Sequence, residues 1–353
     1  MEDPFEQKNT KNSEGSAGAS NPLVSILMPF RNTEKYLREC LDSIQNQSYS
    51  HWELLAVNDH SSDSSSEIVK DYTVRDSRIV LMENKGKGII PALRTAYANS
   101  RGDYITRMDS DDIMVKDKIS ALLYSLIENG PAHLSVGQVK YFSERGISDG
   151  YARYERWINR LTQNGINFSE IYKECVIPSP CWMVLRKDLD ACGAFNSDRY
   201  PEDYDLTFRF YEQGLKCLPC GDILHLWRDY DTRTSRTSEH YAQNYFLDIK
   251  LYYFLKLDFD TNRPLVIWGA GFKGKNLARS LKQRQINFTW LCDNPQKIGK
   301  SIYGIPLVHY KDLAAMHNPQ SVISVANERA QEEIRAYLSA LGLDKPGDSF
   351  FFC

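Results

Sequence analysis

The segment GDYITRMDSDD (residues 102–112) places three carboxylates, those of Asp109, Asp111 and Asp112, directly after an apolar-polar run that is typical of a strand. Carboxylates this close repel one another unless a cation or hydrogen-bond donors compensate their charge. Divalent ions such as Mg²⁺ and Mn²⁺ prefer oxygen ligands and leave room for phosphate oxygens. The alternative is a solvated acidic turn before a helix at residues 116–123, where negative charge is also favourable. The triplet alone favours neither interpretation.

Strands and helices alternate around this segment. Short apolar runs suited to buried strands are LVSILMPF (23–30), HWELLAV (51–57) and RIVLME (78–83), and a pattern that predicts a helix follows each of them. This alternation predicts an α/β fold with a mainly parallel sheet and helices on both faces, in which ligands bind beyond the carboxyl ends of the strands. Polar clusters stand at three of those ends: PFRN (29–32), NDHSSD (58–63) and DSDD (109–112).

The composition indicates a soluble globular protein with little net charge. The chain has 353 residues, and 43 Lys and Arg against 46 Asp and Glu give a net charge of -3, so broad attraction to nucleic acid or anionic lipid is not expected. No apolar run approaches the roughly 20 residues that span a bilayer. Residues 1–21 are polar and rich in Gly and Ser, which predicts a disordered tail and not a signal peptide. The expected location is cytoplasmic.

The eight cysteines are scattered without the spacing of a disulfide framework, which fits a reducing compartment. Cys217 and Cys220 form a single CxxC pair. One such pair, without a second pair or clustered His, is weak evidence for zinc, so ordinary buried thiols are the favoured interpretation.

Four separate blocks carry a family resemblance. They are VSILMPFRNTEKYLRECLDSI (24–44), LLAVNDHSSDSS (54–65), GKGIIPALRTAYANSRGDYITRMDSDD (86–112) and YPEDYDLTFRFYEQG (200–214). In order and spacing they resemble the signature blocks of family 2 inverting glycosyltransferases of the GT-A fold, over roughly residues 22–240. The resemblance implies a GT-A domain at residues 22–237 that moves a sugar from a nucleoside-diphosphate donor, expected to be a UDP-sugar, to a hydroxyl group.

The resemblance also implies roles for individual residues. Asp59 matches the acid that accepts a hydrogen bond from the nucleotide base, and Pro29 and Asn32 frame the base pocket. Asp109 matches the acid that contacts the ribose. Asp111 matches the ligand of the Mg²⁺ or Mn²⁺ ion on the donor diphosphate, with Asp109 as a second candidate ligand.

In the block PEDYDL, Asp203 matches the family's catalytic base, and Glu202 is its neighbour. A single displacement with inversion requires an acceptor hydroxyl to lose its proton as it attacks, and a positioned carboxylate is suited to take that proton. Acids at a helix start, near the positive end of the helix dipole, are the alternative interpretation. Both can hold together.

The chain departs from the family pattern in two places. Asn58 and His60 replace residues of the family's DDGS-like turn, which leaves the choice of base open. Tyr230 stands where many members have a histidine that completes the metal or phosphate site, so Asp231, His225 or water is a candidate final ligand. Five arginines are candidates for binding phosphate oxygens by forked hydrogen bonds, and a structural role is the alternative for each. They are Arg94, Arg107, Arg228, Arg233 and Arg236.

A second unit is expected at residues 263–353, after a linking helix at residues 238–262 with a broad apolar face. That face could pack between domains, against another copy of the chain in a homo-oligomer, or at a membrane surface. In this unit a strand is followed by a turn with Gly269, Gly271 and Gly274 and then by a helix, and Asp293 follows the next strand. This order is a Rossmann-like fingerprint. The unit is short for a dehydrogenase, so an accessory module is favoured over a dinucleotide site.

The order of the two units resembles the eukaryotic β-1,3-N-acetylglucosaminyltransferase-like enzymes, which are queuosine tRNA galactosyltransferases. That resemblance makes a tRNA nucleoside an alternative acceptor. The near-neutral charge lacks the basic footprint common among RNA-binding proteins, so a glycan or glycolipid acceptor is favoured. An NAD-binding oxidoreductase built on the glycine-rich turn is the alternative from another class of protein.

Overall fold

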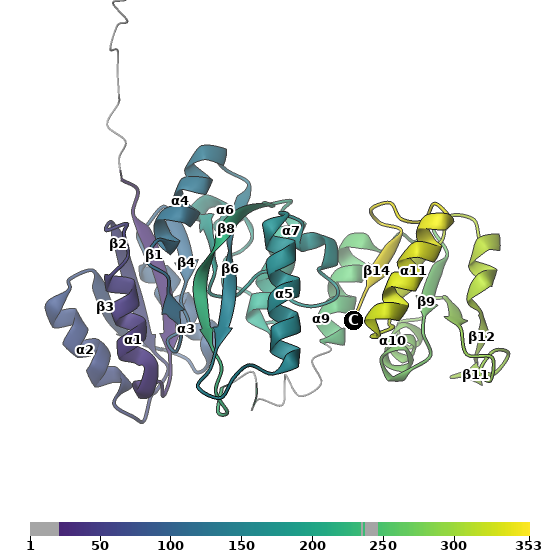
Figure 1. Ribbon diagram of the computed structural model, residues 1–353, viewed down its shortest axis with the longest axis horizontal. Helices are drawn as coiled ribbons and strands as arrows, with labels where there is room; N and C mark the ends of the chain where they lie inside the picture. The colour runs from purple at the N-terminus through teal and green to yellow at the C-terminus, as the bar shows by residue number, and fades with distance from the viewer. Residues whose placement is uncertain (1–20, 234–235, 237–245) are drawn as a thin grey trace, which may run out of the picture.

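The computed structural model describes residues 21–233, 236 and 246–353, which form two α/β modules with a helical segment between them (Figure 1). The predicted tail lies outside the described residues, apart from Asn21. No described helix has the length and apolar character needed to cross a bilayer.

The first module, up to Arg233, contains one eight-stranded sheet with helices on both faces. Its strands are β1 (Val24–Phe30), β2 (Trp52–Asn58), β3 (Ile79–Glu83), β4 (Tyr104–Arg107), β5 (Ile113–Met114), β6 (His133–Phe142), β7 (Trp182–Leu185) and β8 (Lys216–Arg228). Its helices are α1 (Glu34–Gln45), α2 (Ser65–Arg75), α3 (Ile89–Asn99), α4 (Lys118–Asn129), α5 (Asp149–Gln163), α6 (Arg186–Ala191) and α7 (Glu202–Glu212), with a short 3₁₀ helix at Asn167–Glu170.

The strand order is β3-β2-β1-β4-β7-β6-β8-β5. Strands β1 to β4 are parallel, as the alternating pattern predicts. The expectation of a mainly parallel sheet is confirmed, since β6 and β8 are also parallel to each other, with two exceptions: β7 runs antiparallel to both β4 and β6, and β5 runs antiparallel to β8. Regular alternation of strand and helix stops after β4, so nothing in the pattern required the later strands to be parallel. The sheet is therefore mixed.

The apolar patterns produce the core as expected. Every residue of β2 is buried, which is why this strand lacks the alternation of a half-exposed one. Helix α1 buries one stripe, Leu37, Cys40, Leu41 and Ile44, against the sheet. Trp182, in β7, is 2% exposed and belongs to the core.

The second module is a smaller sheet of order β11-β12-β10-β9-β13-β14, the parallel part of which has the order expected of a Rossmann-like unit. At its glycine-rich turn, Gly269 has φ +95°, and a Cβ on Gly274 would lie 2.0 Å from the Gly269 carbonyl oxygen. Only glycine fits these two positions. The elements are β9 (Leu265–Trp268), α10 (Phe272–Gln283), β10 (Thr289–Cys292), β11 (Ser301–Ile302), β12 (Ile305–His309), a 3₁₀ helix (Tyr310–Ala315), β13 (Gln320–Ile323), α11 (Glu328–Ala340) and β14 (Ser349–Phe351).

The linking segment consists of α9 (Leu247–Tyr253) and a π-helical turn (Phe254–Asp258). Helical structure thus ends at residue 258, four residues before the predicted end, and residues 238–245 of the predicted helix lie outside the described residues. Tyr172 of the first module stacks on Phe352 with ring centroids 5.3 Å apart. One apolar core runs through both modules and the linking segment. Of the three roles expected for this segment, packing between the modules is the one the structure contains.

Candidate active site

The predicted polar clusters meet at one edge of the first sheet. Strand β1 pairs in parallel with β2 and with β4, so that Phe30 lies opposite Asn58 and Leu27 opposite Arg107. The loops that follow these three strands therefore leave the sheet side by side.

Asp59 is fixed at the end of β2 and is 6% exposed. Its Oδ1 accepts hydrogen bonds from Asn84 Nδ2 at 2.6 Å and from the Gly88 backbone N–H at 2.9 Å. Its Oδ2 lies 3.8 Å from a guanidinium nitrogen of Arg31. The two hydrogen bonds hold Oδ1 in place, whereas Oδ2 faces the more distant guanidinium of Arg31.

Asn32 joins the first loop to the second. Its backbone has φ 51°, and its Oδ1 accepts a 2.8 Å hydrogen bond from the Ser62 backbone N–H. Pro29 lies in β1 opposite Val57, next to this connection. Asn58, which replaces an acid of the family pattern, accepts from the Ser61 N–H and donates to Glu83, so it stabilises the turn itself.

Of the three crowded aspartates, Asp112 has a structural role. It is fully buried, accepts a 2.7 Å hydrogen bond from the Arg228 backbone N–H, and lies 3.0 Å from His225 Nε2. Burial and the charge of Asp111 raise the pKa of Asp112, and burial lowers the pKa of His225. Because Lys118 Nζ lies 3.3 Å from Nδ1, a neutral His225 carries its proton on Nε2 and donates it to Asp112. His225 is therefore not placed as a metal ligand.

Asp111 is held from β8 and from the residues that follow it. Tyr230 donates a 2.8 Å hydrogen bond to Asp111 Oδ2, so the residue at the family's histidine position contacts the predicted metal ligand. Arg228 Nε donates to the Asp111 backbone carbonyl at 2.7 Å. Burial lowers the pKa of Arg233, but the charges of the three aspartates outweigh that effect and raise it. Asp231 is exposed and forms an ion pair with Arg145.

The fit of a divalent cation follows from these partners. Within residues 21–233, 236 and 246–353, no three His, Cys, Asp or Glu side chains are arranged to hold a metal ion. Asp109 and Asp111 remain as two interacting carboxylates: burial and the charge of Asp111 raise the pKa of Asp109, while the charge of Arg107 opposes that rise. Mg²⁺ is commonly bound by one or two carboxylates together with substrate phosphates and water. The residues present fit an ion that shares its coordination with a diphosphate.

Arg107 connects these aspartates to the predicted base. Its side chain is 1% exposed, and one Nη lies 3.9 Å from Asp109 Oδ1 and donates a 3.2 Å hydrogen bond to Glu202 Oε1. Burial raises the pKa of Asp203, while the charge of Arg107 opposes that rise. Burial and the charge of Asp203 raise the pKa of Glu202 to about 7. The structure thus places Glu202 and Asp109 at one guanidinium, on which the charge of Asp203 also acts, and this is the structural alternative for Arg107.

Two further candidates have structural partners. Arg94 donates to the carbonyls of Phe195 and Asn196 at 2.7 and 2.8 Å and pairs with Asp198, which is the structural alternative for this residue. Cys217 and Cys220 are buried free thiols.

In the second module, side chains of the same module donate hydrogen bonds to carbonyl groups of the glycine-rich turn. Trp290 Nε1 donates to the Gly269 carbonyl at 2.9 Å, and Lys297 Nζ donates to the Ala270 carbonyl at 3.2 Å. Gly271 and Asp293 are exposed. No described contact singles out a ligand for this turn, and its use as a binding site remains a prediction.

Comparisons with known proteins bear on the first module. The family model "Glycosyl transferase family 2" matches residues 25–193. Glycosyltransferase GlyA of Streptococcus pneumoniae is 38% identical over 211 residues, which are 58% of this chain and 30% of GlyA. Glycosyltransferase GlyG of the same organism is 29% identical over 226 residues, which are 61% of this chain and 73% of GlyG. The chain thus spans less than a third of the first relative and most of the second.

Among solved structures, residues 1–349 of S. aureus TarS in complex with UDP-GlcNAc align with a TM-score of 0.52 and 18% identity, over 68% of each chain. This similarity shows the GT-A glycosyltransferase fold. Residues 25–193 therefore match the model of a glycosyltransferase family 2 domain, and the relatives are named as glycosyltransferases.

Proposed function

We propose that the protein transfers a sugar, with inversion and with the help of a divalent cation, from a UDP-sugar to a hydroxyl group of a glycan or glycolipid. The observation that carries the proposal is the convergence on Arg107. Asp109, from the loop after β4, and Glu202, from α7, lie 3.9 and 3.2 Å from one nitrogen of Arg107, and the charge of the predicted base Asp203, next to Glu202 on α7, also acts on this side chain.

In the proposed reaction, Asp203 accepts the proton of the acceptor hydroxyl while that oxygen bonds to the anomeric carbon and the bond from this carbon to the diphosphate oxygen breaks. Asp203 must be ionised to do so. Burial works against ionisation, and the positive charge of Arg107 favours it. Arg107 thereby keeps a partly buried carboxylate available as a base.

Asp59 would accept a hydrogen bond from the nucleotide base at its Oδ2, whose contact with Arg31 is long, at 3.8 Å. Asn32 and Pro29 would border that pocket. Asp111 and Asp109 would hold Mg²⁺ or Mn²⁺, which when bound supplies positive charge for the departing nucleoside diphosphate. Tyr230 and Arg228 keep Asp111 in place for this role.

The choice of a UDP-sugar rests on the match of Asp59 to the family's base-binding acid, and the TarS complex with UDP-GlcNAc is a case of a nucleotide sugar on this fold. A modified tRNA nucleoside of the queuosine type is the alternative acceptor, and only the order of the two modules favours it.

A thermal-shift panel tests the donor. The protein is heated with UDP-, GDP- and dTDP-sugars, each with and without Mn²⁺, and with NAD. A ligand that binds the folded state raises the melting temperature. We expect a rise with a UDP-sugar that depends on Mn²⁺ and is lost in Asp111→Asn, while Asp198→Asn behaves like the wild type. A rise with NAD and none with any nucleotide sugar would contradict the proposal and favour an oxidoreductase.

A further inference from the structure

The helix that bears Asp203 is held by the segment that joins the two modules. Asp205 lies on the same helix, α7, and is 1% exposed. Its Oδ1 accepts a 2.7 Å hydrogen bond from the hydroxyl of Tyr253 on α9, and Arg199 Nε lies 3.5 Å from the same oxygen. A buried carboxylate of α7 is therefore satisfied in part by a donor from outside the first module.

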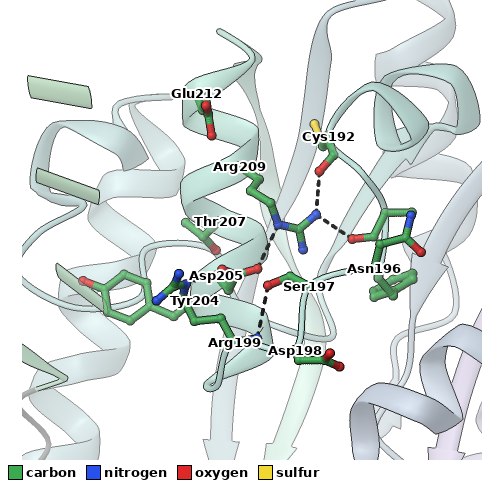
Figure 2. A network of polar contacts seen from close by, with 12 residues as sticks. Cys192, Asn196, Ser197, Asp198, Arg199, Tyr204, Asp205, Thr207, Arg209 and Glu212 are labelled. Carbon is green, nitrogen blue, oxygen red and sulfur yellow. Dashed lines mark hydrogen bonds and ion pairs between the residues drawn. The ribbon is translucent and has the colours of Figure 1, made fainter. Parts of the chain in front are cut away.

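The other oxygen of Asp205 anchors α7 to the loop that precedes it. Arg209 Nε donates a 2.8 Å hydrogen bond to Asp205 Oδ2, and its Nη1 donates to the carbonyls of Cys192 and Ala194, each at 2.6 Å. Figure 2 shows the Arg209 guanidinium between Asp205 and the residues of this loop. Asp205 thus lies at the centre of a network that fixes the first turns of α7.

A stack of aromatic rings runs from the linking segment to the neighbour of Asp203, the predicted catalytic base. The Tyr253 ring stacks on Phe208 with centroids 4.4 Å apart and an interplanar angle of 10°. Phe208 stacks in turn on Tyr204, at 4.8 Å and 22°. Tyr204 is the neighbour of Asp203, and its backbone N–H donates to Asp203 Oδ1 at 2.8 Å. Because Asp203 is held by its own helix, its position follows that of α7.

The linking segment is tied to the second module as well. Asp258, at the end of the π-helical turn, accepts hydrogen bonds from the hydroxyls of Tyr172 and of Tyr211, the latter at 2.9 Å. The Asp258 backbone carbonyl accepts a 2.7 Å hydrogen bond from Gln320 Nε2 at the start of β13. Gln320 is 1% exposed, so this contact is part of the packed interior. One segment therefore holds α7 and the second sheet together.

We propose that Tyr253 is a positioning residue for Asp203, and that through it the second module sets the placement of the helix that bears the base. The inference rests on the proposed function, because it assigns the second module a role in positioning Asp203 for the proposed sugar transfer. A general base must meet the acceptor proton at hydrogen-bond distance, and a displacement of about 1 Å can lower the rate by roughly a hundredfold. The contacts of Tyr253 control such a displacement without touching the donor.

Tyr253→Phe tests this role, with Tyr252→Phe as the matched control. The first substitution removes the hydroxyl that bonds Asp205 and keeps the ring that stacks on Phe208. The second removes the hydroxyl of the adjacent residue, which is 41% exposed. Hydrogen exchange of the α7 amides is measured in both variants, and kcat and the donor KM are measured per folded molecule, with the folded fraction taken from thermal melts.

For Tyr253→Phe we expect faster exchange confined to α7, a kcat lower by roughly 10- to 100-fold, and an unchanged donor KM. Tyr252→Phe should match the wild type. A wild-type kcat in folded Tyr253→Phe, or exchange that rises equally throughout the molecule, would overturn the positioning role. If the wild type itself turns over no nucleotide sugar, the proposed transfer fails; unchanged α7 exchange in Tyr253→Phe then still overturns the inference, and faster exchange confined to α7 supports it.

Discussion

The proposed site has a donor side, made of the loops after β1, β2 and β4, and a base side, made of α7 and its contacts. On the donor side, Asp59 is held by Asn84 and Gly88, close to it in the chain. On the base side, Glu202 is held by Arg107, 95 positions away, and Asp205 by Tyr253, 48 positions away. Asp59 is thus positioned by residues 25 and 29 positions away, whereas the base side, and on the donor side Asp111, which Tyr230 holds from 119 positions away, depend on the whole fold.

Asp203→Asn should produce the largest effect and separate the two sides. Removal of a general base lowers kcat by about 10²- to 10⁴-fold. The donor side lacks this residue, so the donor Kd, measured by calorimetry, should stay near that of the wild type. Loss of donor binding along with turnover would show that the two sides cannot be treated separately.

Arg107→Met removes the residue that both sides share. It leaves Glu202 and Asp203 buried without their cation, and breaking such a pair costs about 3–5 kcal/mol of stability. Protonation relieves the two uncompensated carboxylates, so the loss measured by urea denaturation should be smaller at pH 6 than at pH 8. A loss that is equal at both pH values would contradict the placement of Arg107 between the carboxylates.

Glu202→Gln should have a smaller, pH-dependent effect. The pKa of Glu202 is raised from 4.5 to about 7, so the folded state binds more protons than the unfolded state between these values. Ionisation of Glu202 therefore lowers the free energy of unfolding as pH rises through this window, by up to about 1.4 kcal/mol per pH unit. Subtracting the Glu202→Gln curve from that of the wild type should isolate this slope. A flat difference between pH 4.5 and 7 would show that Glu202 is not buried beside Asp203.

Asp198→Asn should have the smallest effect. Asp198 pairs with Arg94, but its side chain is 86% exposed, and such pairs contribute about 0–1 kcal/mol. Arg94 also keeps its two backbone acceptors, at Phe195 and Asn196. Stability, donor Kd and kcat should therefore all stay near wild-type values. A large fall in donor affinity would instead indicate that Arg94 contributes to donor binding.

The sequence was sufficient for the α/β order of the first module, because β1 and β2 are apolar runs and the polar loops follow them directly. The Rossmann-like unit was predictable for the same reason, since its glycine-rich turn is contiguous. The antiparallel placement of β7 was not predictable, because strand pairing between distant segments leaves no local pattern.

The same distinction holds at the site. Asp59, Asp109, Asp111 and Asp203 could be proposed as site residues from short blocks. The engagement of Asp112 by His225, the bridge made by Arg107 and the contact of Tyr253 with Asp205 were not, because each joins residues that only the folded chain brings together. Burial of Arg107 could not be expected from its position before an acidic turn.

The central claim is that the carboxylates after β4 and the carboxylate of Asp203 act on one bound sugar nucleotide. A crystal structure of Asp203→Asn with a UDP-sugar and Mn²⁺ tests it most directly. The account predicts the diphosphate beside Asp109 and Asp111, with the anomeric carbon facing residue 203. A nucleotide bound elsewhere, for instance at the glycine-rich turn of the second module, or an anomeric carbon turned away from residue 203, would contradict it.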